Sequence, residues 1–318
     1  MQRLPVDSSL QLFKRLAVRN EEPNMNNIAD RPVKRPYVPP DRGRAIGAIL
    51  VEQGRLGAQD VDEIQRFANA HGVRFGEAAV QMKRITEHDI ESALAQQYNY
   101  PVLQRGGQSG VADDVIAAYQ PQSESVEPLR ALRSQLILRW FNSATRKVFA
   151  VTSPERGEGR SWIAANLATM FAQLGERTLL IDADMRQPRQ HRLFNIDNSV
   201  GLSALLTGRA GREIARRIHP QLRLFVLPAG IIPPNPQELL ARPVFEVILD
   251  HFAAQFGLII IDTPAVSETA DAQILAANAG NAVMIARRNY TPQSKLVAAM
   301  ETLTDTGVNV IGSVINAH

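Results

Sequence analysis

The chain has 318 residues, of which 45% are hydrophobic, so it is long enough for two domains with well-buried cores. Its 35 basic and 32 acidic residues leave a formal net charge of +3, which does not indicate a dedicated nucleic-acid binder. The absence of cysteine excludes disulfide scaffolds and cysteine-ligated metal or iron–sulfur sites.

No apolar segment has the length of a membrane-spanning helix. The first 19 residues are interrupted by Asp7, Lys14 and Arg15, which is untypical of a secretory signal. The densest apolar run, residues 258–262, has the length of a strand. We therefore expect a cytoplasmic protein with no transmembrane segment.

Residues 1–43 are polar and contain five prolines between positions 23 and 40, together with clusters of basic residues. This composition cannot bury enough apolar surface to offset the entropy of ordering, so it predicts a disordered, proline-rich basic arm. A short helix over residues 9–19 is an alternative for part of this arm.

An internal half-repeat organises residues 44–105. Ile46-Gly47 recurs as Phe75-Gly76, and Asp60 recurs as Asp89. Each half predicts a helix, a short turn and a second helix that opens with a capping residue. The pattern resembles the small N-terminal domain of type II secretion ATPases, which implies a role in docking a partner protein. An ordinary helical spacer is the alternative.

Residues 106–123 contain three glycines and predict a linker, and a helix is expected from residue 124 to about residue 141. Beyond residue 147, apolar segments alternate with helical ones. This order predicts an α/β fold with a parallel sheet covered by helices on both faces, in which ligands bind at the carboxyl ends of the strands. The predicted strands are 148–152, 178–182, 223–227, 258–262, 282–286 and 308–315.

The loop after the first predicted strand has the features of a phosphate-binding loop. Gly157 and Gly159 allow the backbone to turn its amides toward an anion, and Ser161 offers a hydroxyl to Mg²⁺ at the start of the next helix. Strand, glycine-containing loop and helix are the context of a P-loop NTPase. Arg160 stands where lysine is usual, and Trp162 where threonine is common, so an ordinary glycine turn is the alternative.

Acidic residues follow two other predicted strands. Asp182 ends one strand and is followed by Asp184, and Asp262 ends another. Carboxylates at neighbouring strand ends suit a hard cation that bridges phosphate oxygens. Solvated loop aspartates are the alternative, and the glycine loop upstream favours the metal site.

These motifs together resemble the bacterial tyrosine kinases of the CpsD/CapB/Wzc type over residues 124–318. The resemblance rests on the P-loop, on the Asp182-Ala-Asp184 motif and on Asp262-Thr-Pro264. The small N-terminal domain and the run from Gly157 to Ser161 narrow the match to the EpsG branch, the exopolysaccharide kinases associated with a chain-length determinant.

The resemblance implies an ATP-dependent protein tyrosine kinase with ATP and Mg²⁺ as cofactors. ATP contacts are expected from Gly157, Glu158, Gly159, Arg160, Ser161 and Trp162, with Asn316 facing the base. Catalytic roles are expected for Arg160, Asp182, Asp184 and Asp262. Metal contacts are expected from Ser161, Asp182 and Asp262. Asp271 is a lesser candidate.

A charged triplet, Glu127, Arg130 and Arg133, falls on one face of the helix that precedes the P-loop domain. In the family this motif mediates self-association, so the resemblance implies a homo-oligomer; a solvated charged stripe is the alternative. It also implies a partner, the cytoplasmic tail of a membrane chain-length determinant protein. The expected location is peripheral to the inner membrane through that partner.

Two features favour other functions. Family kinases end in a tyrosine cluster, whereas this chain has five scattered tyrosines and no such cluster at its end. With Arg160 and Trp162, this leaves a nucleotide-gated assembly factor with little kinase activity as an alternative. A ParA/MinD-like positioning ATPase is a third hypothesis. It is disfavoured because Glu155 stands where those proteins carry a lysine. The histidines show no ligand spacing, so surface or capping roles are expected for them, and a position of His191 near the nucleotide is only an alternative.

Overall fold

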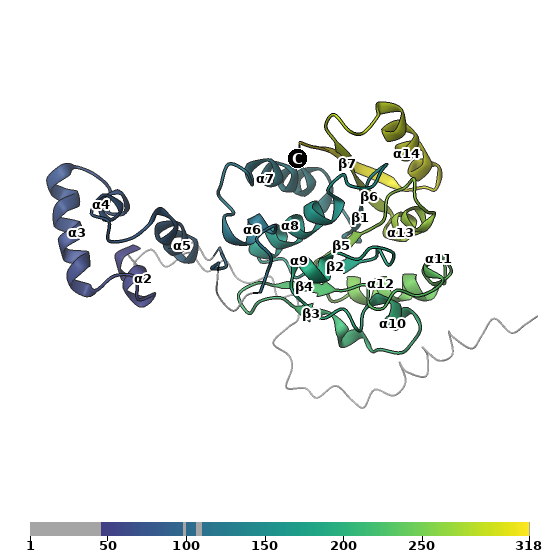
Figure 1. The fold of residues 1–318 in the computed structure, drawn as a ribbon, viewed down its shortest axis with the longest axis horizontal. Coiled ribbons are helices and arrows are strands. Elements are labelled where there is room, and N and C mark those ends of the chain that lie inside the picture. The colour runs from purple at the N-terminus through teal and green to yellow at the C-terminus, as the bar shows by residue number, and fades with distance from the viewer. Residues whose placement is uncertain (1–45, 98–99, 106–109, 318) are drawn as a thin grey trace, which may run out of the picture. The chain divides into compact units, whose positions relative to one another are not determined.

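The computed structural model describes residues 46–97, 100–105 and 110–317, which divide into two compact units between residues 103 and 104 (Figure 1). The predicted arm of residues 1–43, with its short helix, lies outside the described residues. None of the helices in the described part of the chain is long and apolar enough to cross a bilayer.

The first unit consists of four helices. They are α2 (Ile46–Glu52), α3 (Ala58–His71), α4 (Phe75–Gln81) and α5 (Glu87–Gln97). Its core follows the half-repeat, because residues 29 positions apart are buried in pairs. The pairs are Ile49 with Ala78, Leu50 with Ala79, Leu56 with Ile85 and Ile64 with Ala93.

Ion pairs join the two halves of this unit reciprocally. Arg55 Nε lies 3.3 Å from Asp89 Oδ1, and Arg84 Nη1 lies 3.1 Å from Asp60 Oδ1. Each of these aspartates also caps its own helix, since Gly57 N and Thr86 N donate to Asp60 and Asp89, each at 2.9 Å. The aspartates therefore both begin a helix and link one half to the other.

The second unit is built on a seven-stranded sheet in the order β3-β4-β2-β5-β1-β6-β7. The strands are β1 (Val148–Thr152), β2 (Thr178–Asp182), β3 (Arg216–Arg217), β4 (Leu224–Leu227), β5 (Leu258–Asp262), β6 (Asn281–Arg287) and β7 (Asn309–Asn316). All neighbouring pairs are parallel except β3 with β4, so the predicted parallel sheet is confirmed. The short edge strand β3 was not predicted, because two exposed arginines give no apolar signal.

Helices cover both faces of the sheet (Figure 1). On one face α8 (Arg160–Gln173) lies across the central strands beneath α6 (Ile116–Tyr119) and α7 (Glu127–Leu136), and so its side chains are buried almost all round. On the other face α12 (Val244–Ala253) and α13 (Asp271–Ala279) share a core with alternate residues of the strands. The α/β fold with two covered faces is thus confirmed.

The remaining helical elements are short or lie at the margins. They are the π-helical turn η2 (Ile137–Phe141), α9 (Gln190–Leu193), α10 (Leu202–Leu206), η3 (Arg212–Ile214), α11 (Pro236–Leu240) and α14 (Gln293–Asp305). The helix expected from residue 124 to about 141 begins at Glu127 and continues through η2.

Most of the segment predicted as a linker, residues 106–123, is packed in the structure. Its described part, residues 110–123, contains α6, and Ala117 is hydrogen-bonded at both backbone groups. Ala117 N donates to Asn166 Oδ1 at 2.9 Å, and Gln173 Nε2 donates to Ala117 O at 2.8 Å. These two polar side chains of α8 therefore hold the segment in the sheet unit.

Candidate functional site

A glycine-containing loop connects the buried strand β1 to α8. Gly157 and Gly159 adopt the left-handed backbone conformation, with φ of +81° and +93°. A Cβ atom on Gly159 would lie 2.3 Å from Asn316 Nδ2, so both backbone angle and space favour glycine there. The loop ends at the N-terminus of the 14-residue helix α8, where free amides and the helix dipole favour an anion.

A pocket of 820 Å³ opens beside this loop. Its lining includes five of the residues expected to contact ATP, namely Gly157, Gly159, Arg160, Ser161 and Trp162. It also includes Asp184 and cations that sequence reasoning did not assign to the site, namely Arg156, Arg186, Arg189 and Arg192. Cationic side chains around a helix N-terminus suit a polyphosphate.

Two of the predicted aspartates lie side by side at the carboxyl ends of neighbouring strands. Asp182 and Asp262 are register partners at the ends of β2 and β5, and both are fully buried. Asp182 Oδ2 accepts from the backbone amides of Arg189 at 3.0 Å and Gln190 at 2.8 Å. Asp262 Oδ2 accepts from Gln190 Nε2 at 2.8 Å. The Oδ1 atom of each aspartate is buried without a hydrogen-bond partner.

Burial without full compensation shifts the titration of both acids. It raises the pKa of Asp262 to about 6, against hydrogen bonds from the Gln190 and Ser161 side chains that lower it. Burial, followed by the charge of Asp262, raises the pKa of Asp182 well above its ordinary value. A cation near the two carboxylates would offset both costs, so the pair is chemically suited to one.

The donor set around the pair matches magnesium better than a transition metal. The described residues contain no group of three or more His, Cys, Asp or Glu side chains placed to hold a metal. Magnesium commonly uses one or two carboxylates, a hydroxyl, waters and the phosphates of its nucleotide. Asp182, Asp262 and Ser161 supply oxygen ligands of this kind, and two of the carboxylate oxygens are otherwise unpaired.

Gln190 is a site residue that sequence reasoning missed. Its side-chain Nε2 donates to Asp262 Oδ2 at 2.8 Å and to Ser161 O at 3.0 Å, so it links the acid to the start of α8. No motif marks it, because its position depends on the loop that follows Asp184. Its neighbour His191 lines the pocket, and burial lowers the pKa of His191, which keeps the ring neutral at neutral pH.

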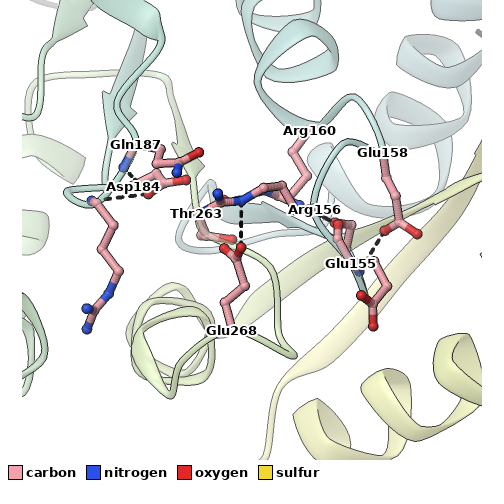
Figure 2. A network of polar contacts seen from close by, with 10 residues as sticks. Glu155, Arg156, Glu158, Arg160, Asp184, Gln187, Thr263 and Glu268 are labelled. Atoms are coloured by element: carbon pink, nitrogen blue, oxygen red, sulfur yellow. Dashed lines mark hydrogen bonds and ion pairs between the residues drawn. The ribbon is translucent and has the colours of Figure 1, made fainter.

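Asp184 and Asp271 are engaged by neighbours in the chain. Asp184 Oδ1 accepts from the backbone amides of Arg186 at 3.2 Å and Gln187 at 2.9 Å, which closes the turn after β2. Asp271 Oδ2 lies 2.9 Å from Arg186 Nε, and this pair joins the turn to the start of α13. Figure 2 shows Asp184 beside Gln187.

Arg160 makes its hydrogen bonds within the protein. Its Nε donates to Thr263 O at 2.9 Å, and its Nη1 donates to Glu155 O at 2.7 Å and to the Ser153 hydroxyl. The guanidinium is nearly buried although it borders the pocket. Arg160 therefore joins the loop to the end of β5, and a phosphate contact by this residue stays a prediction.

Glu158, in the loop itself, and Asn316, at the end of β7, are not among the residues that line the pocket. Glu158 is fully buried; its Oε2 accepts from Glu155 N at 2.9 Å and its Oε1 from the Thr291 hydroxyl. Asn316 Nδ2 donates to Glu158 O at 3.1 Å. Beside them the Arg156 and Glu268 side chains point toward each other and pair at 2.6 Å (Figure 2). The hydrogen bonds of Glu158 and Asn316 thus stabilise the loop, and the predicted ATP contacts of these two residues stay predictions.

The triplet expected to mediate self-association lies on α7. Arg130 Nε donates to Glu127 Oε2 at 2.7 Å, and its Nη1 donates to Pro121 O at 3.1 Å. Arg133 Nη1 donates to Met170 O of α8 at 3.3 Å. Glu127 is the most exposed side chain of the triplet. A contact of the triplet with another copy of the chain stays a prediction.

No protein-family model matches the chain, but individual proteins and solved structures do. Tyrosine-protein kinase YwqD of Bacillus subtilis is 35% identical over 214 residues, which are 67% of this chain and 90% of that protein. Tyrosine-protein kinase ptk of Acinetobacter johnsonii is 33% identical over 202 residues, and the match spans 64% of this chain but only 27% of ptk.

Solved structures give the same picture. The chimerical protein CapA2B2 superposes with a TM-score of 0.61 at 32% identity and covers 71% of this chain and 98% of its own. The kinase domain of the Escherichia coli tyrosine kinase ETK superposes with a TM-score of 0.62 at 28% identity. The match covers 68% of this chain and 83% of the ETK chain.

Proposed function

The chain belongs to the bacterial tyrosine-protein kinases, and from that premise we propose that it transfers the γ-phosphoryl group of MgATP to tyrosine side chains of proteins. One observation carries the proposal. Asp182 and Asp262 lie side by side at neighbouring strand ends, each with a buried, unpaired oxygen, next to the loop that begins α8. Phosphoryl transfer requires such a place for a hard cation beside a phosphate cradle.

Each group has a distinct part in the proposed reaction. The loop amides and the N-terminus of α8 would hold the phosphates, and Ser161 and Asp262 would hold Mg²⁺. Magnesium supplies charge neutralisation at the phosphate oxygens when bound. In this assignment Asp182 does not bind the ion, and its unpaired Oδ1 accepts the proton of the tyrosine hydroxyl. The bond between the γ-phosphorus and the ADP oxygen breaks, a bond from that phosphorus to the tyrosine oxygen forms, and ADP leaves.

The test is transfer of radiolabelled γ-phosphate from ATP to a synthetic tyrosine peptide, with Mg²⁺ and the full chain. We expect Asp182→Asn to lower the rate by at least about a hundredfold, as for loss of a proton acceptor. Asp305→Asn, on the exposed side of α14, is the matched control and should transfer at the wild-type rate. Equal transfer by wild type and Asp182→Asn would contradict the proposal.

We further propose that the kinase regulates exopolysaccharide synthesis together with a membrane chain-length determinant protein. The resemblance to the EpsG branch supports this proposal. In it, the partner's cytoplasmic tail recruits the chain to the inner membrane, and the chain self-associates through Glu127, Arg130 and Arg133. Sedimentation of the wild type against Glu127→Arg tests the last point, since the variant should stay monomeric where the wild type assembles.

A nucleotide-gated assembly factor is the second candidate, and the position of Arg160 favours it. The guanidinium donates to three acceptors of the protein itself, so its charge serves the loop in this state. Under this reading, ATP and ADP would shift the assembly state while no phosphotyrosine forms. Phosphotyrosine formation with an assembly state that ignores nucleotide would contradict it.

A further inference from the structure

A tight turn after β6 presents Tyr290 to solvent. Thr291 N donates to Arg287 O at 2.9 Å, and Arg287 N donates to Thr291 Oγ1 at 2.7 Å, so side chain and backbone both close the turn. Asn289, at its tip, has a φ of +57°. The Tyr290 side chain is 54% exposed. The turn therefore holds a phenol outward on a fixed backbone.

The other described tyrosines differ from Tyr290. Tyr119 is buried, and its hydroxyl donates to Val111 O. Tyr100 is half-buried. Tyr290 is thus the tyrosine, among those in the described ranges, whose ring stands open to another protein.

Side chains from the same segment reach the phosphate loop from behind. The Thr291 hydroxyl donates to the Glu158 carboxylate, and Lys295 Nζ donates to Glu155 Oε1 at 2.8 Å. Arg287 Nη1 makes a longer contact of 3.4 Å with Gly157 O. Hydrogen bonds therefore connect the segment that carries Tyr290 to the loop expected to hold the nucleotide phosphates.

One cation lies over the Tyr290 ring, and two more belong to the same segment. The Arg287 guanidinium carbon lies 5.4 Å from the ring centroid, and Arg288 is exposed on the same turn. Lys295 follows in the first turn of α14, where its Nζ donates to Glu155 Oε1. A phosphate on the Tyr290 oxygen would therefore be close to Arg287, with Lys295 five residues further along the same segment.

We propose that Tyr290 is a phosphoacceptor, modified by a second copy of the chain, and that its phosphate draws Arg287 and Lys295 away from the nucleotide loop. The proposal rests on the kinase function proposed above. A second copy is required because no residue of the segment 287–295 lines the chain's own pocket.

The chemistry is the transfer already described, with MgATP as the phosphoryl donor. A bond forms between the Tyr290 oxygen and the γ-phosphorus, the bond from that phosphorus to ADP breaks, and the phenolic proton passes to Asp182 of the modifying copy. The product carries a charge of about −1.5 to −2 at neutral pH. That charge competes with Glu155 for Lys295 and with Gly157 O for Arg287, and it repels the anionic nucleotide.

The first experiment mixes two full-length variants. Asp182→Asn serves as the acceptor copy and Tyr290→Phe as the active copy, with MgATP and a synthetic tyrosine peptide as an internal reference for kinase activity. We expect mass spectrometry to find phosphate on Tyr290 of the acceptor copy only when the active copy is present. Tyr100→Phe in the acceptor copy is the matched control and should not reduce this signal.

The outcomes separate the two proposals. Peptide phosphorylation with an unmodified Tyr290 overturns the phosphoacceptor inference and leaves the kinase function standing. No transfer to either acceptor overturns both.

A second experiment tests the effect on the loop without any need for kinase activity. Phosphotyrosine is introduced at position 290 during translation, and ADP affinity with Mg²⁺ is measured by calorimetry. We expect affinity about fivefold weaker than wild type, the effect of losing one exposed charge-assisted contact, and unchanged affinity for Tyr290→Phe. Equal affinity for the phosphorylated and unmodified proteins would overturn the coupling to the loop.

Discussion

Asp182 and Asp262 end adjacent parallel strands in register, and each retains a buried carboxylate oxygen without a hydrogen-bond donor. Two like charges so close, removed from water, oppose folding unless a proton or a cation accompanies them. The stability of the sheet unit should therefore report directly on the occupancy of this pair.

Without a cation, we expect the sheet unit to lose stability as pH rises from about 4 to about 6. The pKa of Asp262 is raised in the folded state, so the folded state binds more protons in this window and deprotonation opposes folding. A pKa raised from 3.8 to about 6 corresponds to about 3 kcal/mol for this residue. Urea unfolding followed by tryptophan fluorescence measures the sheet unit selectively, since Trp140 and Trp162 both lie there.

The matched variants for this pH series are Asp262→Asn and Asp305→Asn. The stability of Asp262→Asn should fall much less than that of the wild type as pH rises from about 4 to about 6, because an amide does not titrate. The exposed Asp305→Asn should keep the wild-type slope. Identical slopes for all three proteins would show that Asp262 does not control the pH dependence.

Gly159→Ala should weaken ADP binding by at least about tenfold, because a Cβ at φ +93° is strained by about 1–2 kcal/mol and would also meet Asn316 Nδ2 at 2.3 Å. Gly307→Ala is the control: its φ is +79°, but no atom lies within 4 Å, so only strain remains. Calorimetry should show near-normal ADP affinity for Gly307→Ala. Adding Asn316→Ala to Gly159→Ala removes the contact but not the strain, and should restore affinity only in part.

Arg160→Lys should destabilise the nucleotide-free protein by about 1–3 kcal/mol, since an ammonium cannot reproduce the fork that serves three acceptors. The control is Arg156→Lys, in an exposed ion pair with Glu268 worth at most about 1 kcal/mol. Urea titration without nucleotide measures both. Equal, small losses would mean that the buried hydrogen bonds of Arg160 contribute little.

Gln190→Met removes the donor shared by Asp262 Oδ2 and Ser161 O while keeping the side-chain volume. Losing this donor to the buried Asp262 carboxylate should cost about 2–3 kcal/mol, and the pKa of Asp262 should rise further. Gln187→Met, on the exposed part of the same loop, should be nearly neutral. A Gln190→Met protein as stable as wild type would show that other groups or water satisfy the two acceptors.

Part of this architecture was predictable from sequence. The strands 148–152, 178–182 and 258–262 were predicted to the residue, because each is an uninterrupted apolar run with a polar end, and runs of that kind are buried on both faces. Strand β3 was not predictable, because Arg216 and Arg217 pair with the sheet through backbone alone.

The site divides in the same way. Glycines and strand-end aspartates follow from local pattern, whereas the bridge made by Gln190 depends on the path of a loop. The inward orientation of Arg160 likewise depends on where Thr263 O and Glu155 O lie after folding. Side chains that act through tertiary hydrogen bonds leave little trace in local sequence.

The reciprocal ion pairs of the helical unit have a consequence for how it folds. Arg55 finds its acid in the other half, and so does Arg84, so neither half contains the partners its own arginine needs. If one half were ordered without the other, its arginine and its aspartate would both lack their ion-pair partners. The unit should consequently melt in a single transition, and a fragment bearing one half should pair with an identical fragment to recreate the missing contacts.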